Sequence, residues 1–479
     1  MADTPAARAL PEAVNVVSSR RIKATQLPAT VYSPQPRQAG PIRLNPAKTP
    51  VLGPIGRAGA ALRAGELSCK ELLESCLGAV ERDNPRLNCL VQVTEDAARA
   101  QSELLDEELA TGRDSGALHG IPVSVTDLLD VSGVPTRAGS VTYGILPEED
   151  AASVKLLKDA GAVILGKAAT SEFALGVTPS NGRNPHDPAR IPGGSSAGAA
   201  IAVLAGMGFA SLGTDTRSSV RTSAALCGVV GFKPTFGSIP AGGTVQVSWS
   251  MDHIAPVAAS VADAALLVDL LAGSEVAAFA GADVSALRVG YPPDGTANVD
   301  YGVLAMFQSA MQVITRLAGQ VTEVARPSTL DFSTADAAGL VVSRCEAASF
   351  HRRMGLDRSK STPEVREQLE AADLVAATDY LDAQRLRSML SGTMLKVFED
   401  VDVLVMPACL VPAPLIEEAG DHLLLLARNA VMWSLLGFPA ITVPCGRTAA
   451  GLPVGLQIVA PPHEEASLVA LGSAFELER

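Results

Sequence analysis

Two short serine-containing segments carry the residues in this chain that could do chemistry. The first, GGSSAG, covers residues 193–198, and the second, TDTRSS, covers residues 214–219. Consecutive glycines permit unusual backbone geometries, and a helix after the first segment would direct its N-terminal N–H groups toward the loop, which favours anions and oxyanions. One helix and one short strand fit between the two segments and could bring them together. The residue types alone therefore indicate a serine pair or, more commonly, two plain turns.

Two other motifs in the chain are weaker. The segment GAVILGKA at 161–168 has the G-x4-G-K frame of a phosphate loop. Its middle is branched and apolar, and Ala168 replaces the hydroxyl that would bind magnesium, so we expect a buried strand there. The segment GSSAG fits a G-x-S-x-G frame around Ser196, but the Pro-broken residues 184–193 before it do not resemble the strand that leads into a nucleophile elbow.

Charge and composition exclude several classes of function. The net charge is −13, although the first 50 residues are basic, so the remainder is strongly acidic. Nucleic-acid binding needs clustered Lys and Arg, so we expect no nucleic-acid partner. The scattered histidines predict no metal site and no cofactor. Seven cysteines without a CxxC pair indicate reduced thiols in a cytoplasmic protein. The longest uncharged run is rich in Gly and Ser, so we expect no membrane span.

The chain divides into two parts at the sequence level. Residues 1–55 form a Pro-rich basic extension without helical or strand period, and we expect a surface arm or disordered tail rather than a transit peptide. In the folded part, 56–479, Ser68 and Glu71 form a capping box that begins a helix. Five apolar runs alternate with helical stretches, which predicts an α/β fold with a sheet covered on both faces. These runs are IPVSV, AVILG, VDVLVMP, AITVPCG and PVGLQIVAP.

Several longer segments closely resemble the amidase signature family, in the order and spacing of that family. They are HGIPVSVTDLLDV, GGSSAG, GTDTRSSVR, ALCGVVGFKPTFG, GFPAITVPCG and GLPVGLQIV. The resemblance extends from about Gly56 to the end of the chain. It implies a single α/β domain in which a mixed twisted sheet lies between helical layers. It also implies a Ser-cisSer-Lys triad that cleaves amide or related acyl bonds.

The resemblance assigns roles to individual residues. Ser219 would be the nucleophile, and Ser195, following a cis peptide bond, would transfer the proton. The backbone amides that would form the oxyanion hole are those of Thr216, Arg217, Ser218 and Ser219. The residues that would support the site without touching the substrate are Ser196, Asp215 and Arg221.

Two departures from the family pattern bear on activity. Thr126, natural or introduced, stands where the family has its catalytic lysine, and loss of a general base costs roughly 10² to 10⁴ in rate. Arg217 and Ser218 replace a glycine pair, so a positive φ at either position would cause strain. We expect Arg217 to bind one of the protein's own carboxylates rather than an acidic substrate. Lys167 and Lys233 fall at other lysine positions of the family, so we do not expect either to replace the missing base.

These observations lead to two hypotheses. The first is a serine hydrolase that cleaves an amide, carbamate or ester through an acyl-enzyme on Ser219, with activity impaired by Thr126. The second is an inactive amidase-like binding or scaffold protein. A stand-alone amidase is favoured over the glutamine-cleaving component of a tRNA amidotransferase, since no motif indicates an ammonia channel. We expect a small-molecule substrate, a possible homodimer, and substrate size to be set by residues 277–400, with a helix at 363–374 as part of a lid.

Overall fold

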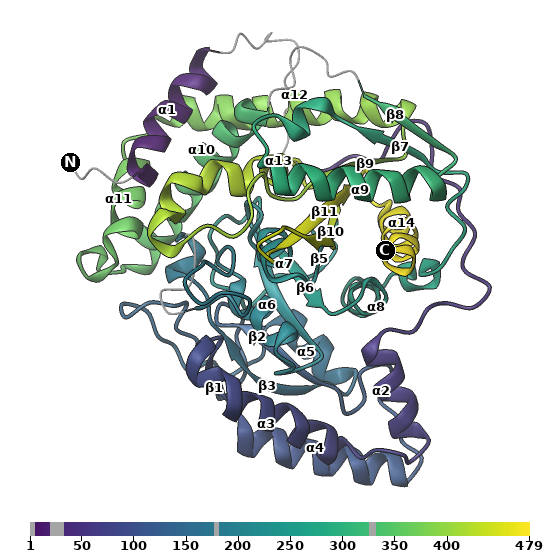
Figure 1. Ribbon diagram of the computed structural model, residues 1–479. Coiled ribbons are helices and arrows are strands. Elements are labelled where there is room, and N and C mark those ends of the chain that lie inside the picture. The colour runs from purple at the N-terminus through teal and green to yellow at the C-terminus, as the bar shows by residue number, and fades with distance from the viewer. Residues whose placement is uncertain (1–4, 20–32, 177–181, 325–331) are drawn as a thin grey trace.

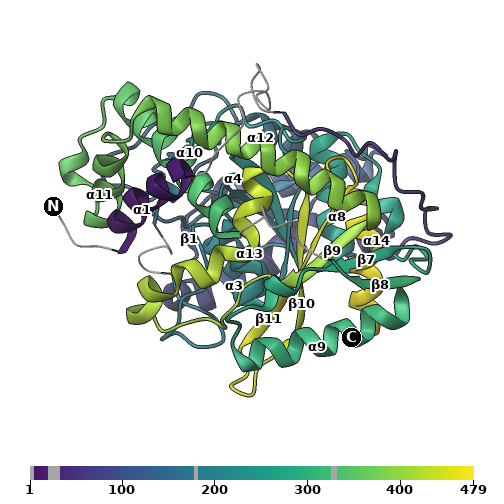
Figure 2. The same ribbon diagram turned by 90° about the horizontal axis from the view of Figure 1, so that it is seen from above.

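An eleven-stranded mixed β-sheet runs through the molecule and has helices on both faces (Figures 1 and 2). The computed structural model describes residues 5–19, 33–176, 182–324 and 332–479. The strands are β1 (Leu90–Val93), β2 (Pro122–Thr126), β3 (Val163–Ala168), β4 (Ala210–Asp215), β5 (Val230–Lys233), β6 (His253–Ala258), β7 (Arg288–Tyr291), β8 (Gln320–Glu323), β9 (Val403–Pro407), β10 (Ala440–Arg447) and β11 (Pro453–Val459). Their order across the sheet is β1-β3-β2-β4-β6-β5-β10-β11-β9-β7-β8.

The sheet combines parallel and antiparallel pairs. Strand β2 runs parallel to β3 and β4, and β7 runs parallel to β8 and β9, whereas the remaining pairs are antiparallel. All residues of β2, β3 and β4 are buried, which explains why their sequences show no polar alternation. The predicted α/β fold is therefore confirmed, and the G-x4-G-K segment forms strand β3.

The α-helices are α1 (Pro5–Ser19), α2 (Pro54–Arg63), α3 (Cys69–Leu87), α4 (Glu95–Ala110), α5 (Ala152–Asp159), α6 (Ala197–Leu204), α7 (Ser219–Cys227), α8 (Val261–Ala272), α9 (Tyr301–Leu317), α10 (Phe332–Met354), α11 (Pro363–Ala372), α12 (Ala377–Asp400), α13 (Leu423–Leu435) and α14 (Glu465–Glu478). Short 3₁₀ helices cover residues 172–174, 276–279, 293–296, 358–360 and 416–422. The predicted capping box is present at the start of α3, where Ser68 accepts a hydrogen bond from the Glu71 N–H.

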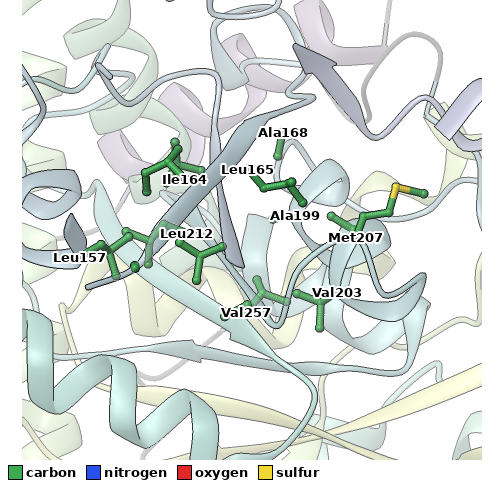
Figure 3. Close-up of a cluster of buried hydrophobic side chains, with 14 of the residues drawn as sticks. Leu157, Ile164, Leu165, Ala168, Ala199, Val203, Met207, Leu212 and Val257 are labelled. Atoms are coloured by element: carbon green, nitrogen blue, oxygen red, sulfur yellow. The ribbon is translucent and has the colours of Figure 1, made fainter. Parts of the chain in front are cut away.

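The uncharged segment between the two serine turns forms α6 and β4, and it packs against the neighbouring strands. Ala199 and Val203 of α6 lie in one apolar cluster with Leu165 of β3, Leu212 of β4 and Val257 of β6 (Figure 3). Small residues are needed here, because a Cβ on Gly198 would lie 2.4 Å from the Ala169 carbonyl oxygen. This close packing fixes the ends of α6 and β4, which carry the two serine turns.

The N-terminal extension differs from the expectation of a surface arm or tail. Helix α1 packs against α10, α11 and α12 (Figure 2). Leu10, Ala13 and Val17 of α1 are buried in the core that includes α10. Beyond α1, Arg37 forms a buried ion pair with Asp402 at 3.0 Å. The surface-arm prediction failed for two reasons. The residues that pack against the apolar face of α1 are distant in the sequence, and Pro11 obscures the helical pattern. Residues 1–4 and 20–32 lie outside the described part, and a domain boundary at residue 55 stays a prediction.

Candidate active site

The two serine turns meet, as the sequence predicts. The hydroxyl oxygens of Ser195 and Ser219 lie 2.6 Å apart. The Ser219 oxygen also accepts a hydrogen bond of 2.6 Å from the Ser196 N–H. Ser219 can donate to the Ser196 hydroxyl at 2.9 Å, and that hydroxyl donates to the Thr214 carbonyl at 2.7 Å. The Ser219 oxygen is thus held by three groups of the GGSS turn.

These serines lie in a cavity of about 470 Å³. Ser195, Ser219 and residues 216–218 line one side of it, and residues of α1, α10, α11 and α13 line the others. The predicted lid helix is α11, whose Glu364 and Gln368 reach the cavity. A substrate carbonyl could therefore approach the Ser219 hydroxyl from the cavity.

Glycine is required where the first turn approaches the second. Gly193 has φ +139°, and a Cβ there would lie 2.4 Å from the Ser223 Cα. The N–H of Gly194 donates to the Ser223 hydroxyl at 3.1 Å, so the GGSS loop is hydrogen-bonded to α7. A side chain at residue 193 would push the two turns apart.

The peptide bond before Ser195 is trans in this structure. Among the described residues no peptide bond is cis. The cis peptide implied by the family resemblance is therefore wrong for this structure. The trans form is the lower in energy by about 3 to 4 kcal/mol for a residue other than proline. The turn is supplied instead by the positive φ of Gly193.

Asp215 and Arg221 form a buried ion pair that supports the turn at residues 214–219, as expected. The Arg221 guanidinium donates to both carboxylate oxygens of Asp215, at 3.0 and 2.9 Å, and both side chains are fully buried. Arg221 also bonds Gln457 of β11 and Ser434 of α13. Burial raises the pKa of Asp215, but the Arg221 charge outweighs this and lowers the pKa to about 2. The pair therefore stays ionised and fixes the start of α7.

A second carboxylate, Asp252, supports the same turn and was not found from the sequence. Its Oδ1 accepts a hydrogen bond of 2.6 Å from the Thr216 hydroxyl, and its Oδ2 accepts from the N–H groups of Val247 and Ser248. Burial raises the pKa of Asp252 to about 7. The available sequence signal for Asp252 was its position in WSMDHIAP, directly before the apolar strand β6.

The main chain of residues 217–219 presents N–H groups at the start of α7. Within the described ranges, no protein group accepts a hydrogen bond from the N–H of Arg217, Ser218 or Ser219. These donors can therefore serve a ligand oxygen, and the N-terminus of α7 adds favourable partial charge. The N–H of Thr216 belongs to the same turn, which leads into this helix.

The replaced glycine pair has the predicted consequences. Ser218 has φ +131°, a conformation that favours glycine, so the expected strain is present at this residue. The Arg217 side chain bonds Asp336 of α10 at 2.5 Å. The expectation that Arg217 binds one of the protein's own carboxylates is confirmed.

Thr126 ends β2 and is 1% exposed. Its hydroxyl has no hydrogen-bond partner in the described part of the chain, so the structure does not bond it to the serine pair. Lys167 lies on the adjacent strand, where its ammonium contacts Asp127 at 3.2 Å and Thr136 at 2.9 Å. The Nζ of Lys233 donates to the Pro234 carbonyl at 3.1 Å. Within these ranges neither lysine bonds a serine of the site, in agreement with the sequence analysis.

The cavity residues of α1 were also missed, whereas those of α10 lie within residues 277–400, the region predicted to set substrate size. The pattern Leu10, Ala13, Val17, spaced i, i+3, i+7, was the available signal for α1. Across the residues that the structure describes, no group of three His, Cys, Asp or Glu side chains is placed to hold a metal ion. None of the described helices combines the length and apolar character needed to cross a membrane.

Comparisons with known proteins show the family of this chain. A family model described as Amidase matches residues 71–469. A glutamyl-tRNA(Gln) amidotransferase subunit from Chloroflexus aurantiacus is 34% identical over 467 residues, which covers 88% of this chain and 96% of the relative. An amidase of Pseudomonas putida is 35% identical over 450 residues, which covers 88% of this chain and 95% of the relative. The solved structure of 6-aminohexanoate cyclic dimer hydrolase complexed with substrate matches with a TM-score of 0.80 at 26% identity, covering 88% of this chain and 96% of that one. This chain belongs to the amidase signature family.

Proposed function

We propose that the protein is an amide hydrolase that forms an acyl-enzyme on Ser219. The observation that carries this proposal is the 2.6 Å separation of the Ser195 and Ser219 hydroxyl oxygens at the wall of the cavity. A serine hydroxyl beside a second hydroxyl, with unpaired main-chain N–H groups on the same turn, has the parts required for acyl transfer.

The proposed reaction has two steps. In the first, the Ser219 oxygen attacks the substrate carbonyl while Ser195 accepts the Ser219 proton and passes its own hydroxyl proton to the substrate nitrogen, and the N–H groups of residues 216–219 stabilise the oxyanion. The C–N bond then breaks, and the protonated nitrogen leaves as the amine or ammonia. In the second step, water attacks the ester on Ser219, which releases the acid and restores the serine.

We further propose that Thr126 stands at the position of the family's catalytic lysine and that activity is impaired for this reason. The Thr126 hydroxyl is buried without a described hydrogen-bond partner, so it is not bonded to Ser195 in this structure. A threonine hydroxyl cannot accept a proton near pH 7, so Ser195 lacks a base. Catalysis would rest on the oxyanion donors and on positioning.

A small-molecule amide is the substrate that we favour, with a carbamate or ester as related alternatives. The amidase of Pseudomonas putida supports this choice, and the volume of the cavity is typical of a small-molecule site. The amidotransferase relative from Chloroflexus aurantiacus supports a second candidate, a glutamine-cleaving component of a larger complex. An inactive binding protein is the third. The seven unpaired cysteines support a reducing, cytoplasmic location.

Covalent labelling with a serine-directed phosphonate tests the proposal. Intact-mass spectrometry should show one adduct on the native protein and none on Ser219→Ala. Ser309→Ala, which removes an exposed serine hydroxyl on α9, is the matched control and should label like the native protein. Failure of both the native protein and Thr126→Lys to label would instead support the binding-protein alternative.

A further inference from the structure

Helix α1 forms one wall of the cavity that contains the serine pair. The family model begins only at residue 71, and the relatives cover 88% of this chain, so the N-terminal extension lies outside the region that the family model matches. Even so, four residues of α1 line the same cavity as Ser195 and Ser219. They are Ala9, Glu12, Ala13 and Val16.

The wall is anchored to the body of the protein. Leu10, Ala13 and Val17 are at most 5% exposed and pack into the core shared with α10. Ser18, near the end of α1, donates a hydrogen bond of 3.2 Å to Asp379 of α12. Figure 2 shows α1 lying beside α10 and α11. The helix is therefore a packed element of the site.

The cavity that α1 lines is more apolar than polar. Ala337 and Leu340 of α10 and Leu423 and Leu426 of α13 lie on the cavity with Ala9 and Val16. Two charged side chains on the cavity bond protein groups, since Arg217 bonds Asp336 and Arg344 bonds Gln368. The other charged residues on it are Glu12, Glu364 and Asp421. Glu12 is exposed and lines the cavity. Transfer of an apolar group from water into such a space is favourable.

We infer that α1 is a specificity element, and that the substrate is an amide bearing an alkyl or aryl group that extends from the scissile bond to α1. This inference rests on the proposed function for the identity of the reacting bond. It assigns to Ala9, Ala13 and Val16 the contact with the apolar end of the substrate. A residue that fills this space should exclude long apolar amides and leave short amides unaffected.

The test compares 4-phenylbutyramide with butyramide, which share an acyl chain and differ by the phenyl ring. Ala9→Trp and Val16→Trp fill the cavity from two positions on α1. Asn15→Trp places the same side chain on the exposed face of the helix and is the matched control. We expect the two filling variants to lower kcat/KM for 4-phenylbutyramide at least tenfold and to change that for butyramide less than twofold.

A binding measurement separates this inference from the proposed function. In a Ser219→Ala background, which cannot form the acyl-enzyme, 4-phenylbutyramide should raise the unfolding temperature more than butyramide does. Adding Ala9→Trp or Val16→Trp should abolish that difference, and adding Asn15→Trp should keep it. If the expected binding difference is seen but neither the native protein nor Thr126→Lys hydrolyses either amide, the proposed hydrolase function is wrong and the inference about α1 stands. Equal shifts for the two amides, or no effect of either filling variant, would overturn the inference about α1.

Discussion

The Thr216 hydroxyl donates a 2.6 Å hydrogen bond to the buried carboxylate of Asp252, which connects the turn at residues 214–219 to the segment that precedes β6. Asp252 also accepts hydrogen bonds from two main-chain N–H groups, of Val247 and Ser248. One of the two carboxylates that support the turn is therefore a group whose pKa burial raises to about 7.

This raised pKa predicts a pH-dependent stability. An unfolded aspartate has a pKa of about 3.9, so between about pH 4 and 7 the folded state keeps a proton that the unfolded state loses. The free energy of unfolding should therefore fall as the pH rises through this window. Asp252→Asn resembles the protonated acid and does not titrate. The pH-dependent contribution of this residue to the free energy of unfolding is therefore absent in the variant. Urea unfolding at pH 5 and 8 should show a smaller loss in the variant, and an equal loss in both proteins would contradict the prediction.

Ser218→Gly should stabilise the protein by about 1 kcal/mol, because Ser218 has φ +131° and side chains other than glycine are strained there. The change also removes the hydrogen bond between the Thr222 and Ser218 hydroxyls. Ser218→Ala is the matched control, since it loses the same bond and keeps the strain. Calorimetry should rank glycine above alanine, and the reverse order would show that this backbone is unstrained.

Gly193→Ala should lower the free energy of unfolding by more than about 2 kcal/mol, because a Cβ there would lie 2.4 Å from the Ser223 Cα. Gly206→Ala provides the comparison, since Gly206 also has a positive φ, of +72°, but no atom within 4 Å of the added Cβ. That change should cost only about 1 kcal/mol. Similar losses in urea unfolding would mean that the two serine turns are not tightly packed.

Much of the fold and the centre of the site could be predicted from local sequence. The capping box at Ser68 and the apolar strands identified their elements because neighbouring residues carry the signal. The two serine turns were noticed from their residue types, but the roles of Ser195 and Ser219 were predicted from the family resemblance. Helix α1 was missed, since its apolar face is short and is explained only by α10 and its neighbours, which follow more than 300 residues later. Asp252 was missed because a single acidic residue does not reveal its burial.

Hydrolysis of a simple amide by Thr126→Lys tests the central claim most directly. Thr126→Met is the matched control, because it adds a long side chain without a base. If Ser219 and Ser195 are intact and only the base is missing, kcat/KM should rise by roughly 10² to 10⁴ in the lysine variant and remain low in the methionine variant. A folded Thr126→Lys protein that hydrolyses amides no faster than Thr126→Met would contradict the account.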